Sequence, residues 1–287
     1  MEYVAYADES YVRAERFRSI CSFSFPINHH DDIESELTAL LEESNVSEFK
    51  WKKLKGAKYR FFAEKIIHFI ANNQPKYKLR IDVLIWDTHD DRHNVQLRDD
   101  KANFERMFFH LLNSSMKRRG KNSVWSIFPD ERLDIDWATI HKCIECVGAE
   151  QEEIENPLFG DFLSDPYYSI YDFSEIESHK YPCCQIADFF AGICVYSKIN
   201  YKRFEKWKKS SKKELPLFES KNPIELTNSE RERFRVLKCL NDECKKRKLG
   251  VSLKSRKCLF TFNPSNPINF WHYVPQHNLD RAPTKDA

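Results

Sequence analysis

The chain has 287 residues, of which 41% are hydrophobic and 14% aromatic, so it can bury a substantial core and is not disordered throughout. It contains only six glycines and neither a Rossmann nor a P-loop motif, which removes the main support for those two kinds of nucleotide site. The net charge of +2 is nearly neutral but unevenly distributed.

Basic residues are concentrated toward the C-terminus. Residues 191–287 contain 22 Lys and Arg against 10 Asp and Glu, whereas residues 1–190 contain 24 against 34. An acidic first part with a basic end fits a metal-binding core joined to a surface that binds a polyanion. A solvated, lysine-rich helix would give the same balance, so both interpretations stay open on charge alone.

Neither membrane insertion nor secretion is expected. No apolar run approaches the roughly 18 residues that a membrane span needs. The opening sequence MEYVAYADES lacks the basic region and apolar stretch of a signal peptide. The nine cysteines are odd in number and scattered, so we expect free thiols and a cytoplasmic location.

Strand and helix patterns alternate along the chain. Alternating or continuous β-prone runs predict strands at residues 2–8, 17–25, 78–87, 124–128 and 167–173. Apolar residues at helical spacing predict helices at residues 30–43, 57–73, 94–118, 136–147 and 182–198. Because a hairpin comes first and single strands then alternate with helices, we expect an α/β protein with a mixed sheet covered by helices.

A boundary is expected near residue 200. Residues 1–200 would form the core, residues 201–262 a basic and mainly helical appendage, and residues 263–287, which contain four prolines, an extended C-terminal tail.

The appendage has a candidate nucleic-acid surface. Lys206 and Lys209 alternate there with the aromatic residues Tyr201, Phe204 and Trp207. Basic residues interleaved with stacking rings suit a phosphate backbone or a single strand. The alternative is an amphipathic helix whose rings dock on the core while its lysines stay in water.

Three aspartates occupy positions typical of a catalytic site. Asp8 ends the first strand, Asp130 follows the strand at 124–128, and Asp188 lies one turn into the helix at 182–198. Strand ends converge in such sheets, so these carboxylates can meet. Singly, each is explained by turn or helix-start preferences. A cluster, however, predicts one or two Mg²⁺ or Mn²⁺ ions, because grouped carboxylates repel without a cation.

Three short motifs together resemble the domain of unknown function 3800 family. They are YADES at residues 6–10, DER at 130–132 and QIADFFAG at 185–192, and the resemblance covers about residues 1–200. It implies a ribonuclease H-like fold and a setting in bacterial antiviral defence or a mobile element. Pro129 departs from the family pattern, which usually has an apolar strand residue there, so the end of that strand could be displaced.

The resemblance also implies roles for individual residues. Glu48 and Lys50 match a Glu-x-Lys element, so Glu48 would be a fourth carboxylate ligand and Lys50 a phosphate contact. Asp8 would bridge two ions, and Asp130 and Asp188 would bind one each.

Two further residues are candidate substrate contacts. Gln185, one turn before Asp188, would orient that carboxylate or touch substrate. Arg132 would pair with phosphate, although a surface ion pair explains it slightly better. Two weaker candidates are a zinc site at His141, Cys143 and Cys146, which lack a second cysteine pair, and Asp87 as a reserve ligand.

The sequence therefore predicts a metal-dependent nuclease acting on RNA or DNA with two Mg²⁺ or Mn²⁺ ions. The main alternative is a non-catalytic protein that keeps the fold and binds nucleic acid or a partner. A phosphoryl-transfer enzyme acting on a nucleotide is a third possibility. A protein partner or a homo-oligomer stays open.

Overall fold

The computed structural model describes the chain except for residues 11–15, 91–98, 133, 150–166, 212–224 and 275–287. Its centre is a six-stranded sheet in the order β5-β4-β1-β2-β3-β8. The strands are β1 (Glu2–Ser10), β2 (Phe17–Pro26), β3 (Arg80–Asp87), β4 (Ser123–Pro129), β5 (Tyr168–Phe173) and β8 (Ile268–His272). The short strands β6 (Val251–Ser252) and β7 (Phe260–Thr261) form a separate pair.

The sheet is mixed, as the sequence predicts. β1, β2 and β3 are antiparallel neighbours, whereas β4 runs parallel to β1, β5 parallel to β4, and β8 parallel to β3. The register pairs Ala7 of β1 with Pro129 of β4. Pro129 is therefore the last residue of its strand, and the strand end is not displaced. The two strands finish at the same edge of the sheet, which positions the residues that follow them.

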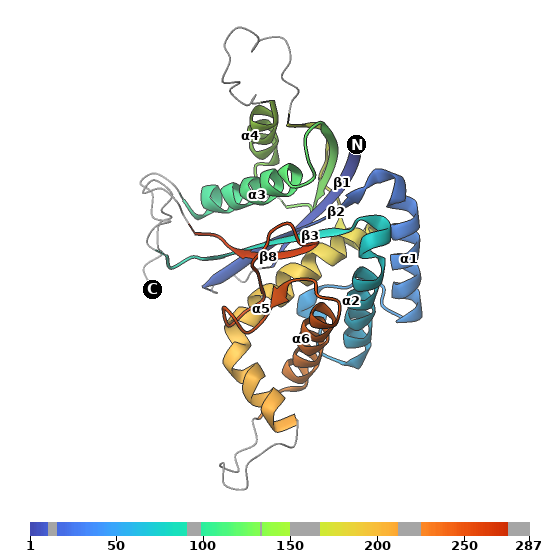
Figure 1. Cartoon of the computed structure of the whole chain (residues 1–287), viewed down its shortest axis with the longest axis vertical. Coiled ribbons are helices and arrows are strands. Elements are labelled where there is room, and N and C mark those ends of the chain that lie inside the picture. The colour runs from blue at the N-terminus through green and yellow to red at the C-terminus, as the bar shows by residue number, and fades with distance from the viewer. Residues whose placement is uncertain (11–15, 91–98, 133, 150–166, 212–224, 275–287) are drawn as a thin grey trace.

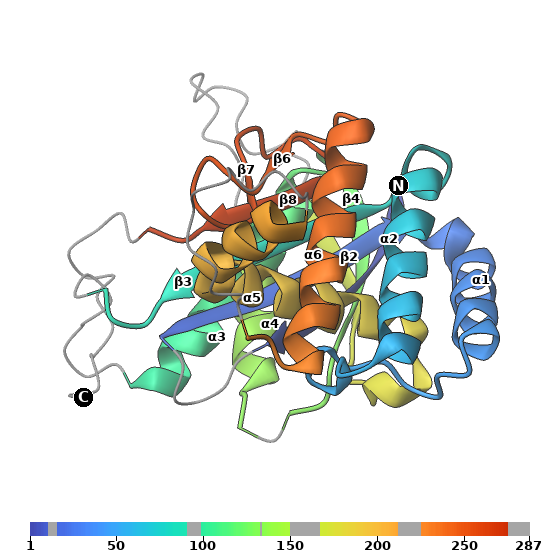
Figure 2. The same cartoon turned by 90° about the horizontal axis from the view of Figure 1, so that it is seen from below.

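Helices cover both faces of the sheet. They are α1 (His30–Glu43), α2 (Ala57–Tyr77), α3 (Asp100–Lys117), α4 (Trp137–Ala149), α5 (Pro182–Ser211) and α6 (Asn228–Lys246). Figure 1 shows α3 and α4 on one face and α1, α2, α5 and α6 on the other. Figure 2 shows α6, α2 and α1 side by side, with α5 running beneath the strands. The protein is thus a three-layer α/β structure.

The alternation of side chains along β1 separates two hydrophobic cores. Val4 and Tyr6 pack into the core under α1, α2, α5 and α6, whereas Tyr3 and Ala5 pack into the core under α3 and α4. This period of two is the expected geometry of a strand buried on both faces. It directs Asp8 toward α5 and Glu9 toward the opposite layer.

Most element positions agree with the sequence analysis. The helix expected at 30–43 is α1. The helix expected at 94–118 is α3, which spans Asp100–Lys117. It begins there because the Asp99 side chain accepts a hydrogen bond from the Ala102 N–H (2.8 Å) and caps the helix. The helix expected at 57–73 continues to Tyr77 and ends where Lys78 adopts a left-handed conformation.

The segment beyond residue 198 differs most from expectation. α5 crosses the expected boundary without a break and continues to Ser211. Phe204 and Phe234 pack edge to face within the same core that contains Val4. Residues 268–272, expected in an extended tail, form the edge strand β8 beside β3. Packing on the core thus integrates the C-terminal third with the sheet. In the described ranges no helix is long and apolar enough to cross a membrane.

A buried charge network fastens β8 to the sheet. The fully buried carboxylate of Asp82 accepts hydrogen bonds from Arg80 Nε (2.7 Å), Arg118 Nη1 (3.1 Å) and Asn269 Nδ2 (2.9 Å). Three elements, β3, the end of α3 and β8, therefore meet at one side chain.

Replacing Asp82 with Ala is expected to lower the free energy of unfolding by about 3–5 kcal/mol, because two guanidinium groups would lose their buried partner. Asp87→Ala is the control. It removes an ion pair with Arg16 that is largely exposed, and should cost no more than about 1 kcal/mol. Urea denaturation of both variants measures the difference. Equal losses would contradict a structural role for the Asp82 network.

Candidate active site

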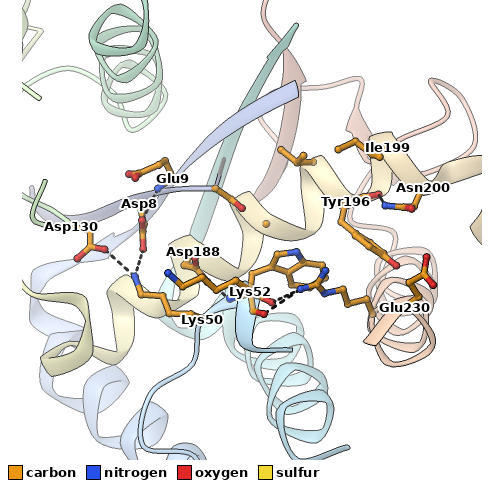
Figure 3. A pocket seen from close by; sticks show the side chains of 15 residues that line it. Asp8, Glu9, Lys50, Lys52, Asp130, Asp188, Tyr196, Ile199, Asn200 and Glu230 are labelled. Atoms are coloured by element: carbon orange, nitrogen blue, oxygen red, sulfur yellow. Dashed lines mark hydrogen bonds and ion pairs between the residues drawn. The ribbon is translucent and has the colours of Figure 1, made fainter. Parts of the chain in front are cut away.

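The three predicted aspartates line one cavity of ≈ 540 Å³ beside β1 and α5 (Figure 3). Asp8 is near the end of β1, and Asp130 directly follows β4. The Asp130 N–H donates to the Ala7 carbonyl (2.8 Å), so the parallel pairing of β1 and β4 places these two carboxylates next to each other. Asp188 reaches the same cavity from the second turn of α5.

Lys50 lies between two of the carboxylates. Its ammonium donates to Asp8 Oδ2 (3.1 Å) and to Asp130 Oδ2 (2.9 Å) (Figure 3). Burial alone would lower the pKa of Lys50, but the carboxylates of Asp8, Asp188 and Asp130 raise it above its ordinary value. The lysine is therefore a fixed cation that offsets part of the clustered negative charge.

The segment carrying Lys50 is held by two side chains of α5. Gln185 Oε1 accepts from the Phe49 N–H (2.8 Å), and Asp188 Oδ2 accepts from the Trp51 N–H (2.5 Å). Gln185 also donates to the Ser178 carbonyl (3.1 Å). Gln185 is therefore buried and positions the Lys50 segment. The structure shows no hydrogen bond from it to Asp188, and it does not line the cavity.

A glycine allows the close approach that this arrangement needs. A Cβ atom built on Gly192 would lie 2.2 Å from Cγ of Trp51. The indole thus packs directly against the α5 backbone, one turn beyond Asp188. This contact sets the distance between the helix and the Lys50 segment.

Burial perturbs the acids of the site. It raises the pKa of Asp8 well above its usual range, although Lys50 opposes the shift. It raises the pKa of Asp188 to about 6, with Lys50 and the Trp51 N–H opposing it. Repulsion from the neighbouring carboxylates raises the pKa of both Asp8 and Asp188 further. Such displaced pKa values are typical of functional sites, although structural ion pairs also produce them.

The donor set suits a hard divalent cation. Five carboxylates line the cavity, those of Asp8, Glu9, Asp130, Asp188 and Glu230, against the cations of Lys50, Lys52 and Arg233, so with every group ionised the lining carries two excess negative charges. In the arrangement seen here, with Lys50 between Asp8 and Asp130, no three His, Cys, Asp or Glu side chains among the described residues surround one point as metal ligands would.

Glu48 and Arg132 lie outside the cavity lining. Glu48 forms an ion pair with Lys53 at the surface. Arg132 pairs with Glu9 and Asp134, and its guanidinium lies 4.6 Å from the Phe104 ring centroid. Glu9 does line the cavity, so Arg132 stands behind its wall. A role for either residue in metal or substrate binding remains a prediction.

The basic face of α5 is also separate from the cavity. Lys206 and Lys209 are exposed on the last turns of the helix and do not line it. The expected stacking of aromatic residues on a single strand is wrong for Phe204, which is fully buried, and Trp207 packs with Phe234 (5.6 Å between ring centroids). The rings are used by the core. Contact of the two lysines with nucleic acid stays a prediction.

The remaining candidates have other partners. His141 Nε2 lies 3.2 Å from Glu145 Oε1, and Cys143 and Cys146 are exposed on the same helix. Asp87 accepts hydrogen bonds from Nε and Nη2 of Arg16 outside the cavity. These contacts do not form a zinc site, and Asp87 does not line the acidic cavity as a reserve ligand would.

The second half of the cavity was not anticipated from the sequence. Its wall contains Trp51 and, from α6, Arg233. Tyr196 of α5 lies in the same wall (Figure 3). The Arg233 guanidinium lies 5.3 Å from the Trp51 ring centroid and 5.6 Å from that of Tyr196. The Tyr196 hydroxyl is buried and has no hydrogen-bond partner within the described part of the chain. Helical periodicity places Tyr196 on the buried face of α5, but no local sequence pattern shows that α6 contributes to this cavity.

Fold and cavity together define an α/β protein with a pocket in which buried carboxylates surround a lysine. The chain is 31% identical over 290 residues to the uncharacterized protein ORF2′ of Methanothermobacter thermautotrophicus, covering 99% of this chain and 98% of that protein. It is 32% identical over 293 residues to the uncharacterized protein ORF2 of the same organism, with equal coverage. The chain belongs to the family of these proteins. No protein-family model matches it, and the resemblance to the domain of unknown function 3800 family stays a prediction.

The raised pKa of Asp188 predicts a pH-dependent stability when divalent ions are removed with EDTA. The folded state holds a proton that the unfolded state releases, so the contribution of Asp188 to stability is complete below the ordinary pKa of 3.8 and is lost as pH rises through about 6. Asp188→Asn should therefore gain about 1–3 kcal/mol relative to wild type between pH 4 and pH 7. Urea denaturation across this range measures it. A difference in unfolding free energy between the two proteins that does not change with pH would contradict the raised pKa of Asp188.

Proposed function

We propose that this protein is a metal-dependent nuclease that hydrolyses phosphodiester bonds in RNA or DNA. The supporting observation is that Asp8, Asp130 and Asp188, separated by more than a hundred residues from the first to the second, line one cavity. A pocket whose carboxylates come from two neighbouring strand ends and one helix can hold divalent ions for phosphoryl chemistry.

The proposed fold is ribonuclease H-like. Three features support it: the N-terminal antiparallel strands, the parallel strands β4 and β5 added beside β1, and the acids at the ends of β1 and β4. The motifs that resemble the domain of unknown function 3800 family point the same way. A setting in antiviral defence or a mobile element is what that resemblance implies.

Asp8, Asp130 and Asp188 are the residues that would hold Mg²⁺ or Mn²⁺. A bound ion would supply an activated water and stabilise charge on the leaving oxygen. Lys50 keeps the carboxylates together, and when a cation offsets their charge its ammonium is suited to contact a substrate phosphate. Trp51, Tyr196 and Arg233 form the wall against which the sugar or base would rest.

One observation favours the non-catalytic alternative. Lys50 satisfies Asp8 and Asp130 without any metal, as in a purely structural ion-pair cluster. In that case the same cavity would bind nucleic acid or a partner protein and cleave nothing. The two proposals differ in whether the protein cleaves nucleic acid when divalent ions are present, and cleavage can be measured directly.

Asp8→Asn and Asp188→Asn are each expected to reduce cleavage by about a hundredfold or more, because each removes a charged oxygen from the proposed ion site. Labelled single- and double-stranded RNA and DNA would be incubated with Mn²⁺, Mg²⁺ or EDTA. Asp87→Asn is the matched control, since this aspartate also ends a strand but pairs with Arg16. Binding without cleavage by wild type under every condition would favour the alternative.

Tyr196→Phe tests the other half of the cavity. Removing a buried hydroxyl that lacks a partner should leave stability unchanged or raise it by about 1 kcal/mol. If the hydroxyl bonds to the substrate, KM rises about three- to tenfold while kcat is retained. Steady-state kinetics with thermal unfolding measure both quantities. A fall in kcat at constant KM would place Tyr196 in a different role.

A further inference from the structure

A second cavity, of ≈ 530 Å³, lies at the far edge of the sheet on the α3 side. It is bordered by the last turns of α3, by β7 and by β8, and its wall includes Arg118, Asn269 and Trp271. Alternate residues of β8 point here, because Ile268 and Phe270 enter the core on the α5 side. This cavity shares no lining residue with the acidic site.

A buried polar atom at this cavity lacks a partner. Asn269 is fully buried, and its Nδ2 donates to Asp82 Oδ1 (2.9 Å). The Asp82 carboxylate accepts hydrogen bonds from Arg80 and Arg118 as well, so the Asn269 amide must point its nitrogen, and not its oxygen, toward Asp82. The amide oxygen has no donor among the described residues. Because buried acceptors are normally paired, this oxygen is a candidate to accept an N–H from a bound ligand.

Aromatic side chains form the walls around that acceptor. The Arg118 guanidinium lies 4.5 Å from the centroid of the Trp271 ring. Phe260 and Phe262 meet edge to face (5.0 Å between centroids), and Phe262 is 67% exposed. An exposed phenylalanine beside an arginine-capped tryptophan suits a flat ring that can stack.

An adjoining cavity of ≈ 200 Å³ is lined by cations. Arg118 borders both cavities, and Lys78, Arg80 and Arg119 border the smaller one. Arg119 donates to two backbone carbonyls, of Lys78 (2.9 Å) and Ser24 (2.7 Å), and burial lowers its pKa to about 10. Over the ranges that the structure describes, neither Arg119 nor Lys78 pairs with a carboxylate. Lys78 is exposed and Arg119 half-buried, so two cations without a carboxylate partner among the described residues border this cavity and favour an anion there.

We propose that the two cavities together bind a nucleoside phosphate. The base lies between Phe262 and Trp271 and donates an N–H to the Asn269 carbonyl oxygen. The phosphate lies beyond Arg118, against Arg119 and Lys78. The same chemistry is offered by a free nucleotide and by the phosphorylated end of a strand. The site does not depend on the nuclease proposal, because no acidic-cavity residue contributes to it.

Isothermal titration calorimetry in EDTA buffer, which removes divalent ions from the acidic cavity, tests this site with AMP as the probe. AMP should bind to the full chain, and purine ribonucleoside 5′-monophosphate, which lacks the exocyclic amine, should bind about tenfold more weakly. Adenosine and inorganic phosphate should each bind more weakly than AMP. A 5′-phosphorylated oligoadenylate that binds more tightly than AMP identifies a strand end, and one that binds no tighter identifies the free nucleotide.

Two exposed positions allow variants that keep the fold. Phe262→Ala should weaken AMP binding at least about fivefold through lost stacking, whereas Tyr171→Ala, at another exposed ring, should not. Lys78→Gln should weaken it about two- to fivefold, and Lys58→Gln, at the other end of α2, should not. No AMP binding at millimolar concentration, or binding that both Phe262→Ala and Lys78→Gln leave unchanged, overturns the proposal.

Discussion

The geometry of the acidic cavity depends on one ammonium group. Asp8 and Asp130 are brought together by the parallel pairing of β1 and β4, and the buried carboxylate of Asp8 and the half-buried one of Asp130 repel each other. Lys50 resolves the conflict by donating to both. Removing it would leave charge buried without compensation, which is far more costly than the net value of the pair itself.

The position of Lys50 depends in turn on α5. Gln185 and Asp188 bind the backbone on either side of the lysine, so the helix that contributes one acid also locates the cation opposing the other two. Asp188 therefore has two uses: one oxygen fixes the Lys50 segment, and the side chain borders the cavity. A site built this way is organised before anything binds, which reduces the cost of ordering it later.

Local pattern was enough for much of this arrangement. The periodicity of α1 and the strand ends near Asp8 and Asp130 were readable because one element determines each of them. Contacts between distant elements were not. Nothing near Glu48 shows that it turns to Lys53, and nothing in α6 shows that Arg233 reaches Trp51. In the C-terminal third, the sequence left open whether the aromatic rings stack on nucleic acid or dock on the core, and only the packing of Phe204 against Phe234 decides for the core.

The length of α5 sets a scale for any strand that binds. Asp188 and Lys209 lie 21 positions apart on one continuous helix, which at 1.5 Å per residue is roughly 30 Å. That span equals about nine stacked bases at 3.4 Å each. A strand of about this length could contact both ends of the helix, whereas an oligonucleotide of a few nucleotides would reach only the end near the acidic residues. On the proposed function, the length of this rigid helix would therefore determine which strands are long enough to contact both of its ends.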